Sequence, residues 1–372
     1  MSSTQQKDLQ GQANVRPDNE NPASDWGLTS AISLEMIQAD AQALARQLDD
    51  SDGRVGVLKH KTAQEWIEEA KKRPKPKMLF DEFWCEGELC ILYADTNVGK
   101  SIMAVQIGNS ISKGECIAGF SLTAEKQKIL YFDFELSDKQ FENRYSVDFE
   151  NLYVFDDNFV RVEIDVDVED IMNKNFEDSL SDSIELLIVE TQSKVLIIDN
   201  LTYLKTETER AGTALPLMHH LRALKNKYKL SILALAHTPK RNDAVAISRN
   251  DLQGSKSLMN LIDSSFSIGQ SKQDKALRYL KQMKIRQKEF VFGETNVAVF
   301  KVNKVNSFLQ FELLGFDKEF EHLKSPKDKE RENKIAEVIE LKKQGFNNVQ
   351  IAEKTGLSEG GVRKYLKKQS NS

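Results

Sequence analysis

Residues 89–112 constrain the fold of this chain more than any other segment. An apolar run, Leu89–Tyr93, leads into a short loop that ends in Gly99, Lys100 and Ser101, and an amphipathic stretch follows it. A strand, a loop ending in Gly-Lys-Ser and a helix form the context of the phosphate-binding loop, G-x-x-x-x-G-K-[ST]. Ala94 stands where that pattern has its first glycine. The segment therefore predicts a buried strand, a phosphate-binding loop and a helix.

The predicted loop specifies its ligand chemistry. Backbone N–H groups of such a loop surround phosphates, and the dipole at the helix N-terminus favours their negative charge. Lys100 is expected to contact the β- and γ-phosphates of ATP, and Ser101 to bind Mg²⁺, which prefers oxygen ligands. The residues expected around the nucleotide are Ala94, Asp95, Thr96, Asn97, Val98, Gly99, Lys100, Ser101 and Ile102. The alternative is a chance strand–turn–helix whose glycine serves packing.

Apolar strand-like runs alternate with helical stretches over most of the chain. The expected strands cover residues 89–93, 129–134, 195–198 and 232–235, and the expected helices cover residues 100–112, 137–145, 168–190 and 215–229. This alternation predicts an α/β fold with a mainly parallel, twisted sheet covered on both faces. After Asp263 the period changes to two, and residues 277–285, 296–302 and 308–314 predict antiparallel C-terminal strands at one edge.

The same patterns divide the chain into five segments. Residues 1–28 are polar without apolar periodicity, which predicts a disordered N-terminal tail. Residues 29–48 show helical spacing, residues 63–72 predict a second short helix, and two prolines follow it. Residues 29–76 are therefore expected to form a helical N-terminal extension. Residues 77–318 carry the α/β pattern, and residues 334–372 form a small, separate all-α unit. Residues 319–333 are expected as a charged linker, although the charged, proline-containing residues 323–333 also fit the start of a helix.

The composition excludes several classes of protein. With 40% hydrophobic and 29% charged residues the chain can build a packed core, so it is neither a fibre nor wholly disordered. No run reaches the roughly 18 apolar residues of a membrane span, and no secretory signal is visible. The three cysteines lack metal-ligand spacing and indicate reduced thiols, so we expect a cytoplasmic protein without a membrane partner. A net charge of −5 excludes a globally basic coat for nucleic acid.

Acidic residues stand at the ends of two expected strands. Asp199 ends the run VLIID and is expected to hold the Mg²⁺ shell; the alternative is a solvated carboxylate that caps the next turn. Glu135 follows the run YFDF and is expected to orient or deprotonate the attacking water. The alternative for Glu135 is a first-turn glutamate favoured by the helix dipole. Asp133 projects on the same face as Glu135 and is the second candidate for the base.

Three basic residues follow later in the chain. His237 ends the run SILALA, where it fits either a sensor of the γ-phosphate or a structural histidine. Lys284 and Arg286 lie two apart on an expected strand and so project on one face. They fit either a cationic finger that reaches a neighbouring subunit's γ-phosphate or a solvated basic strand face.

The last segment is predicted to fold into three short helices, with Gly356 in a turn and Ser358 capping the third. Residues 323–372 contain 12 Lys and Arg against 7 Asp and Glu, a net of +5, so the rest of the chain carries −10. This pattern is similar to a helix-turn-helix that binds DNA; the alternative is a protein-docking module. The cations expected to reach DNA are Arg363, Lys364, Lys367 and Lys368.

The order of these motifs resembles the RecA-like P-loop ATPases of the RepA type, a family of hexameric replicative helicases of plasmids and mobile elements. The resemblance covers residues 79–316 and is carried by YADTNVGKS, FDFELS, VLIIDNL, ALAHTPKR, GSKSLMNLID and KQMKIRQKE. It implies that Glu135 is the catalytic base and His237 a phosphate sensor. It also implies that Lys284 and Arg286 reach into the adjacent subunit's site.

The resemblance further implies a homo-oligomer, a hexameric ring that admits single-stranded DNA, with replication or mobilisation partners. The sequence therefore predicts an ATP-hydrolysing motor that acts on DNA, a RepA-type replicative helicase. Two other functions stay open. One is an ATP-switched DNA recombination or partition factor, and the other is a DNA-binding regulator that uses ATP only for assembly.

Overall fold

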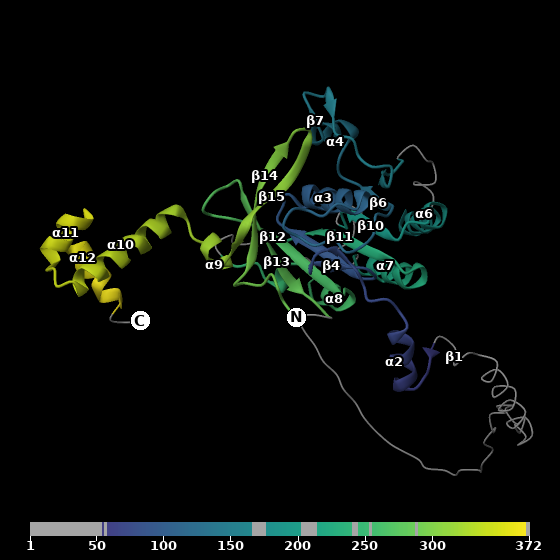
Figure 1. The fold of residues 1–372 in the computed structure, drawn as a ribbon, viewed down its shortest axis with the longest axis horizontal. Helices are drawn as coiled ribbons and strands as arrows, with labels where there is room; N and C mark the ends of the chain where they lie inside the picture. The colour runs from purple at the N-terminus through teal and green to yellow at the C-terminus, as the bar shows by residue number, and fades with distance from the viewer. Residues whose placement is uncertain are drawn as a thin grey trace, which may run out of the picture. The chain divides into compact units, whose positions relative to one another are not determined.

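The computed structural model describes residues 54–55, 58–165, 176–201, 214–239, 245–252, 255–286 and 289–369 (Figure 1). The chain separates into two units, Met1–Pro74 and Lys75–Ser372, and the boundary lies between the two prolines that the sequence analysis singled out. The expected tail at residues 1–28 and the helical spacing at residues 29–48 lie outside the described residues.

Within its described residues, the first unit contains a short hairpin and one helix. Strand β1 (Arg54–Val55) pairs antiparallel with β2 (Leu58–Lys59), and helix α2 spans Ala63–Lys71. A capping box starts α2, because the Thr62 side chain accepts from the Glu65 N–H and the Glu65 carboxylate accepts from the Thr62 N–H at 2.7 Å. The cap explains why the helix begins where it does.

A nine-stranded sheet forms the centre of the second unit. Its order is β15-β14-β13-β12-β5-β11-β10-β6-β9. The strands β5 (Leu89–Ala94), β6 (Ile129–Asp133), β9 (Phe159–Val162), β10 (Val195–Asp199), β11 (Ser231–His237) and β12 (Ser264–Gln270) pair in parallel. The strands β13 (Leu277–Lys284), β14 (Val297–Val305) and β15 (Phe308–Asp317) extend this sheet antiparallel at one edge. The predicted fold class, α/β with antiparallel C-terminal strands, is confirmed.

Helices cover both faces of the sheet (Figure 1). Alternate residues of β5 enter opposite cores, because side chains alternate along a strand. Cys90 and Leu92 pack with helix α3 (Lys100–Lys113), whereas Leu89, Ile91 and Tyr93 pack with the helices of the other face. Those helices are α6 (Phe176–Thr191), α7 (Ala214–Tyr228) and α8 (Ser255–Leu261). Each fully buried apolar side chain stabilises the fold by roughly 1.5–3 kcal/mol.

Short elements connect these layers. They are β3 (Met78–Phe80), β4 (Trp84–Cys85), α4 (Asp138–Arg144), β7 (Ser146–Val147), β8 (Asn151–Leu152) and a single 3₁₀ turn, η1 (Arg249–Asp251). The pair β3–β4 and the pair β7–β8 are antiparallel hairpins outside the main sheet. The helix expected at residues 168–190 is described only from residue 176 onward.

Four helices end the chain: α9 (Glu319–His322), α10 (Pro326–Lys343), α11 (Asn348–Thr355) and α12 (Glu359–Gln369). Val338, Ile351 and Val362 contribute one fully buried side chain from each of the last three helices. Residues 319–333, expected as a charged linker, form α9 and the first turns of α10, which agrees with the alternative of a helix start in residues 323–333. The reason is local, because Ser325 and Asp328 form a capping box with Pro326 in the first turn.

Candidate active site

The polar residues singled out in the sequence meet at one edge of the sheet. Strands β5, β11, β10 and β6 are parallel neighbours, so their carboxyl ends lie side by side. The register pairs His237 with Ala94 and Asp199 with Asp133. The strands are buried because their residues are apolar. The first polar residue after each strand therefore lies at the same edge of the sheet.

The loop between β5 and α3 has the backbone of a phosphate-binding loop. Asn97 and Gly99 adopt positive φ angles of 63° and 111°. A Cβ at Gly99 would lie 2.8 Å from the ring of Phe311, so the position requires glycine on steric as well as backbone grounds. Ala94 is the last residue of β5 and is not among the residues with positive φ. The missing first glycine is therefore no obstacle to the shape of this loop.

Lys100 stands buried at the centre of the site. Its ammonium donates to the carbonyl oxygens of Ala94 and Asp95, both at 3.0 Å, and lies 3.0 Å from His237 Nδ1. Burial lowers the pKa of Lys100 to about 8, although the nearby carboxylates of Asp199, Glu135 and Asp95 partly oppose this. The ammonium thus rests on weak acceptors, which a phosphate can replace.

Glu135 lies beside His237, although strand β10 separates β6 from β11 in the sheet. Its Oε1 is 3.5 Å from His237 Nε2 and also accepts from the Asn200 amide. Hydrogen bonding to His237 is the largest cause that lowers the pKa of Glu135, with burial opposing it. The carboxylate is therefore ionised and oriented, which a general base requires. Asn200 was missed in the sequence, although it directly follows Asp199.

Asp199 is buried at the end of β10. Its Oδ2 accepts from the Tyr131 hydroxyl at 2.7 Å, and its Oδ1 has no hydrogen-bond partner within the described residues. Burial raises the pKa of Asp199 to about 6, and the side chains of Ser101 and Tyr131 partly oppose this. An unpartnered buried carboxylate oxygen beside the Ser101 hydroxyl fits a hard cation. Ser101 and Asp199 would hold Mg²⁺, which neutralises phosphate charge when bound with the nucleotide.

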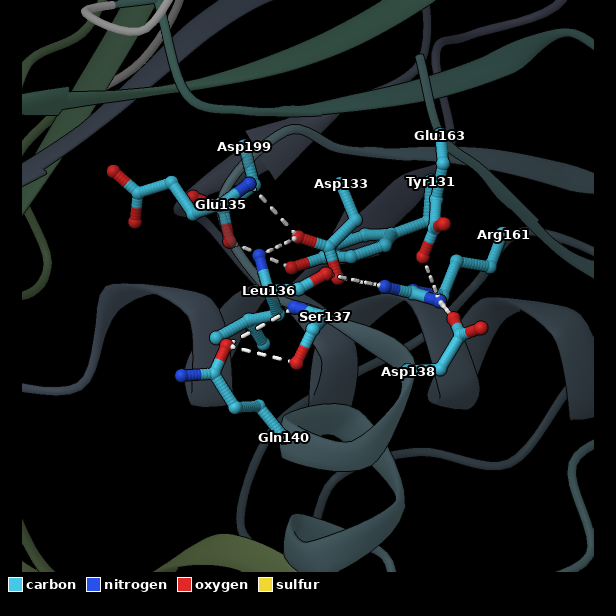
Figure 2. A network of polar contacts seen from close by, with 10 residues as sticks. All are labelled: Tyr131, Asp133, Glu135, Leu136, Ser137, Asp138, Gln140, Arg161, Glu163 and Asp199. Atoms are coloured by element: carbon cyan, nitrogen blue, oxygen red, sulfur yellow. Dashed lines mark hydrogen bonds and ion pairs between the residues drawn. The ribbon is translucent and has the colours of Figure 1, made fainter. Parts of the chain in front are cut away.

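Asp133 lies in a polar network that joins it to Arg161 and to the backbone of the segment carrying Glu135 (Figure 2). Its Oδ2 accepts from Arg161 Nε at 3.0 Å, and its Oδ1 accepts from the backbone N–H groups of Glu135 at 3.3 Å and Leu136 at 3.0 Å. Arg161 also donates to Asp138 at 2.8 Å and to the Leu136 carbonyl at 2.7 Å. Both carboxylate oxygens of Asp133 are thus engaged in holding the segment that carries Glu135. This favours Glu135 over Asp133 as the base.

Lys284 and Arg286 lie far from this edge within one chain. Lys284 pairs with Ser265 at the amino end of β12, whereas the phosphate loop follows the carboxyl end of β5, which runs parallel to β12. Strand β13 ends at Lys284, so the expectation that Arg286 also lies on the strand is wrong. The chain turns there, and the Arg286 guanidinium points back to the Asn260 carbonyl at 2.8 Å.

Both cations bind the C-terminal end of α8. Lys284 Nζ donates to the carbonyl oxygens of Met259 and, at 2.8 Å, Ile262, and Arg286 also lies 3.3 Å from Asp263. Positive charge at a helix C-terminus is favourable because the last carbonyls lack partners in the helix. Burial is the largest cause that lowers the pKa of Lys284. Within one chain, the pair is therefore a helix cap.

The four cations expected to bind DNA lie on or near one short helix. Arg363, Lys364 and Lys367 are exposed on α12, and the side chain of Lys368 is outside the described residues. Arg363 pairs with Glu359 at 2.6 Å within the same helix. Such an exposed pair contributes little, about 0.3–0.5 kcal/mol, so a phosphate can displace the glutamate.

Two features are absent from the described part of the chain. No helix there is long and apolar enough to cross a membrane. No group of three or more His, Cys, Asp or Glu side chains there is placed to hold a metal ion by itself.

Comparison with known proteins places the sequence in a family. The sequence model described as "AAA domain" matches residues 57–243, which is half of the chain. No curated protein sequence matches it. Among solved structures, the chain matches a KaiC-like protein from the hyperthermophilic archaeon Pyrococcus horikoshii OT3 at 11% identity and a TM-score of 0.43. That match covers 63% of this chain and 93% of the archaeal one.

Proposed function

The chain belongs to the AAA domain family, and we propose that its RecA-like ATPase core drives an oligomeric motor on DNA, a replicative helicase of the RepA type. One observation supports the ATPase part most directly. Lys100, Glu135 and His237 converge in a single hydrogen-bonded group at the end of four parallel strands. Asp199 and Ser101 complete the set needed for a nucleotide with Mg²⁺.

The contacts assign each side chain a task. Lys100 moves its ammonium from the two loop carbonyls to the phosphates, where charge develops during hydrolysis. Glu135 accepts the proton of the attacking water, because it is ionised and held by Asn200. His237 contacts both Lys100 and Glu135. When a phosphate takes Lys100, His237 loses a partner, and the orientation of Glu135 changes with it.

The DNA part is supported by α12 and by the charge of its surroundings. Three described cations of this helix are exposed, and residues 323–372 carry +5 in a chain of net −5. A buried residue from each of three helices holds the small unit together, so α12 presents its cations from a packed scaffold. This arrangement suits phosphate contacts of a helix-turn-helix. The RepA-type motif order adds the helicase and the ring to the proposal.

One experiment separates the motor from the two other functions. The full chain is given ATP, Mg²⁺ and a forked DNA duplex, and strand separation is followed together with phosphate release. The helicase separates strands and hydrolyses ATP faster with single-stranded DNA. Turnover without strand separation supports the recombination or partition factor. DNA binding without turnover supports the regulator.

The contacts of Lys284 and Arg286 with α8 favour keeping the recombination or partition factor as a second candidate function. Capping a helix in their own chain is a sufficient role for both cations, so neither has to reach a neighbouring subunit. A mixing experiment decides between the roles. Arg286→Ala and Lys100→Ala variants are combined after subunit exchange has been demonstrated by fluorescence energy transfer. If Arg286 acts in a neighbouring site, junctions with an intact Lys100 and an intact Arg286 restore partial ATPase activity. No restored activity at any ratio leaves both cations as a helix cap.

A further inference from the structure

The antiparallel extension of the sheet contacts the phosphate loop from outside. Arg278, the second residue of β13, donates from Nε to the Val98 carbonyl at 2.9 Å. Its Nη1 donates to the carbonyl oxygens of Lys275 at 2.6 Å and Leu277 at 3.0 Å. No sequence motif marks Arg278, which lies 180 residues after its partner in the loop.

The charge of Arg278 has no counter-charge in the part of the chain that the structure describes. All its hydrogen bonds there go to carbonyl oxygens, and no carboxylate forms an ion pair with it. Burial lowers the pKa of this half-buried arginine, and no neighbouring acid raises it. A guanidinium nevertheless stays protonated in proteins. Keeping an unpaired charge half-buried costs free energy, so an anion nearby would offset that cost.

The bond to Val98 also orients the next peptide. The C=O and N–H of a trans peptide point in opposite directions, so holding the Val98 carbonyl toward Arg278 directs the Gly99 N–H away from Arg278. Loop N–H groups of this kind are the donors that bind phosphates. The loop is further held by Phe311 of β15, whose ring lies where a Cβ of Gly99 would stand.

The extension is fastened to the helix that follows the loop. The Phe311 N–H donates to Gln106 Oε1 at 2.9 Å, and Gln106 Nε2 donates to the Phe311 carbonyl at 3.0 Å. Gln106 lies on α3, two turns after Lys100. The antiparallel strands that carry Arg278 are therefore bonded to the helix that follows the loop.

We propose that Arg278 is a positioning residue of the nucleotide site, which holds the Val98–Gly99 peptide in its phosphate-binding orientation and places a positive charge behind the loop. The inference rests on the proposed nucleotide-binding function. It also specifies the ligand class. A loop N–H serves the phosphates that ADP and ATP share, so Arg278 strengthens the binding of both nucleotides equally and does not read the γ-phosphate.

Calorimetry of Mg-ADP and of a slowly hydrolysed Mg-ATP analogue tests this, with thermal melting as the check on folding. Arg278→Ala should lower the affinity for both nucleotides by a similar factor of about tenfold, because one charge-assisted hydrogen bond is lost. Arg278→Lys should recover only part of this, because an ammonium lacks the planar fork that reaches several carbonyls. In steady-state ATPase assays KM should rise more than kcat falls. Lys301→Ala, which removes an exposed cation from the neighbouring strand β14, is the matched control.

Four outcomes would overturn the inference. The first is undiminished affinity of Arg278→Ala for both nucleotides. A loss confined to the ATP analogue would instead make Arg278 a γ-phosphate contact. An equal loss in Lys301→Ala would reduce the effect to net charge, and full recovery in Arg278→Lys would remove the role of the guanidinium. The proposed function fails separately, when the wild-type chain binds neither nucleotide, and the inference then fails with it.

Discussion

The charges in the candidate active site and those on α12 lie in opposite environments. Lys100 is 6% exposed and Asp199 is 1% exposed, and burial shifts the pKa of each. The side chain of Arg363 on α12 is 69% exposed, and its partner Glu359 is one turn away. A buried charge interacts strongly with a ligand group in direct contact, and this interaction depends on the geometry of the contact. An exposed charge interacts with its ligand through water, and dissolved salt screens that interaction. The two regions should therefore respond differently to substitution, pH and salt.

The largest effect is expected from Lys100→Ala. The substitution removes the only ammonium in the buried group with Glu135 and His237, and leaves a cavity beside two carbonyls. Affinity for Mg-ATP should fall about 100-fold or more, since a buried charge-assisted contact to phosphate is lost. Calorimetry measures this, and Lys113→Ala at the other end of α3 serves as the control. Affinity close to that of the wild type would refute the site.

A comparable effect, but on turnover alone, is expected from Glu135→Gln. The amide keeps the size of the side chain and cannot accept a proton. ATP affinity should be kept while hydrolysis slows about 100-fold, the usual scale for a general base. Single-turnover assays separate the two quantities. Asp133→Asn is the comparison: it should change thermal stability more than chemistry, because Asp133 binds Arg161. If Asp133→Asn stays folded and loses turnover instead, Asp133 is the base.

A smaller effect is expected from pH. Lys100 has a pKa of about 8 without ligand, and phosphates favour its charged form. Above the pKa of Asp199, which is about 6, affinity for ATP should therefore change little up to about pH 8 and fall beyond it, by about tenfold near pH 9. Binding at pH 9 should take up close to one proton, which calorimetry in buffers of different ionisation enthalpy detects. Proton release, or no pH dependence in this range, would contradict the protonation state assigned to Lys100.

The smallest effect is expected on α12. Lys364→Ala should weaken duplex DNA binding only a few-fold and lower the salt slope by about one unit, as for one lost phosphate contact. Fluorescence anisotropy over a salt series measures both. Lys343→Ala, on α10, removes the same charge elsewhere and should leave the slope unchanged. Equal slopes for both variants and the wild type would favour the protein-docking module. ATPase activity should be unaltered in either variant.

Local sequence predicts most of the residues at the carboxyl ends of the parallel strands. A run such as VLIID is apolar enough to be buried on both faces, and a parallel strand then delivers its terminal Asp199 to the carboxyl edge. The same reasoning anticipated Lys100, Glu135 and His237, and all three lie in contact. The antiparallel strands and the three C-terminal helices were anticipated from their periods. These features depend on residues that are neighbours in the chain.

The remaining features depend on contacts between distant parts of the chain, and no local pattern encodes them. Arg161 binds Asp133 from strand β9, which joins the sheet only through its pairing with β6. Arg278 reaches Val98 because β12 pairs with β5 and turns back as β13.

The sequence by itself therefore determined the strand ends, the phosphate loop and the chemistry of their side chains, since a hydrophobic period and a glycine-lysine motif act over a few residues. Only the tertiary structure decided which of two carboxylates is tied to an arginine, that Lys284 and Arg286 cap a helix, and which cation supports the loop. Each of those outcomes requires strand order and register, because a side chain's partner is set by where the sheet brings it.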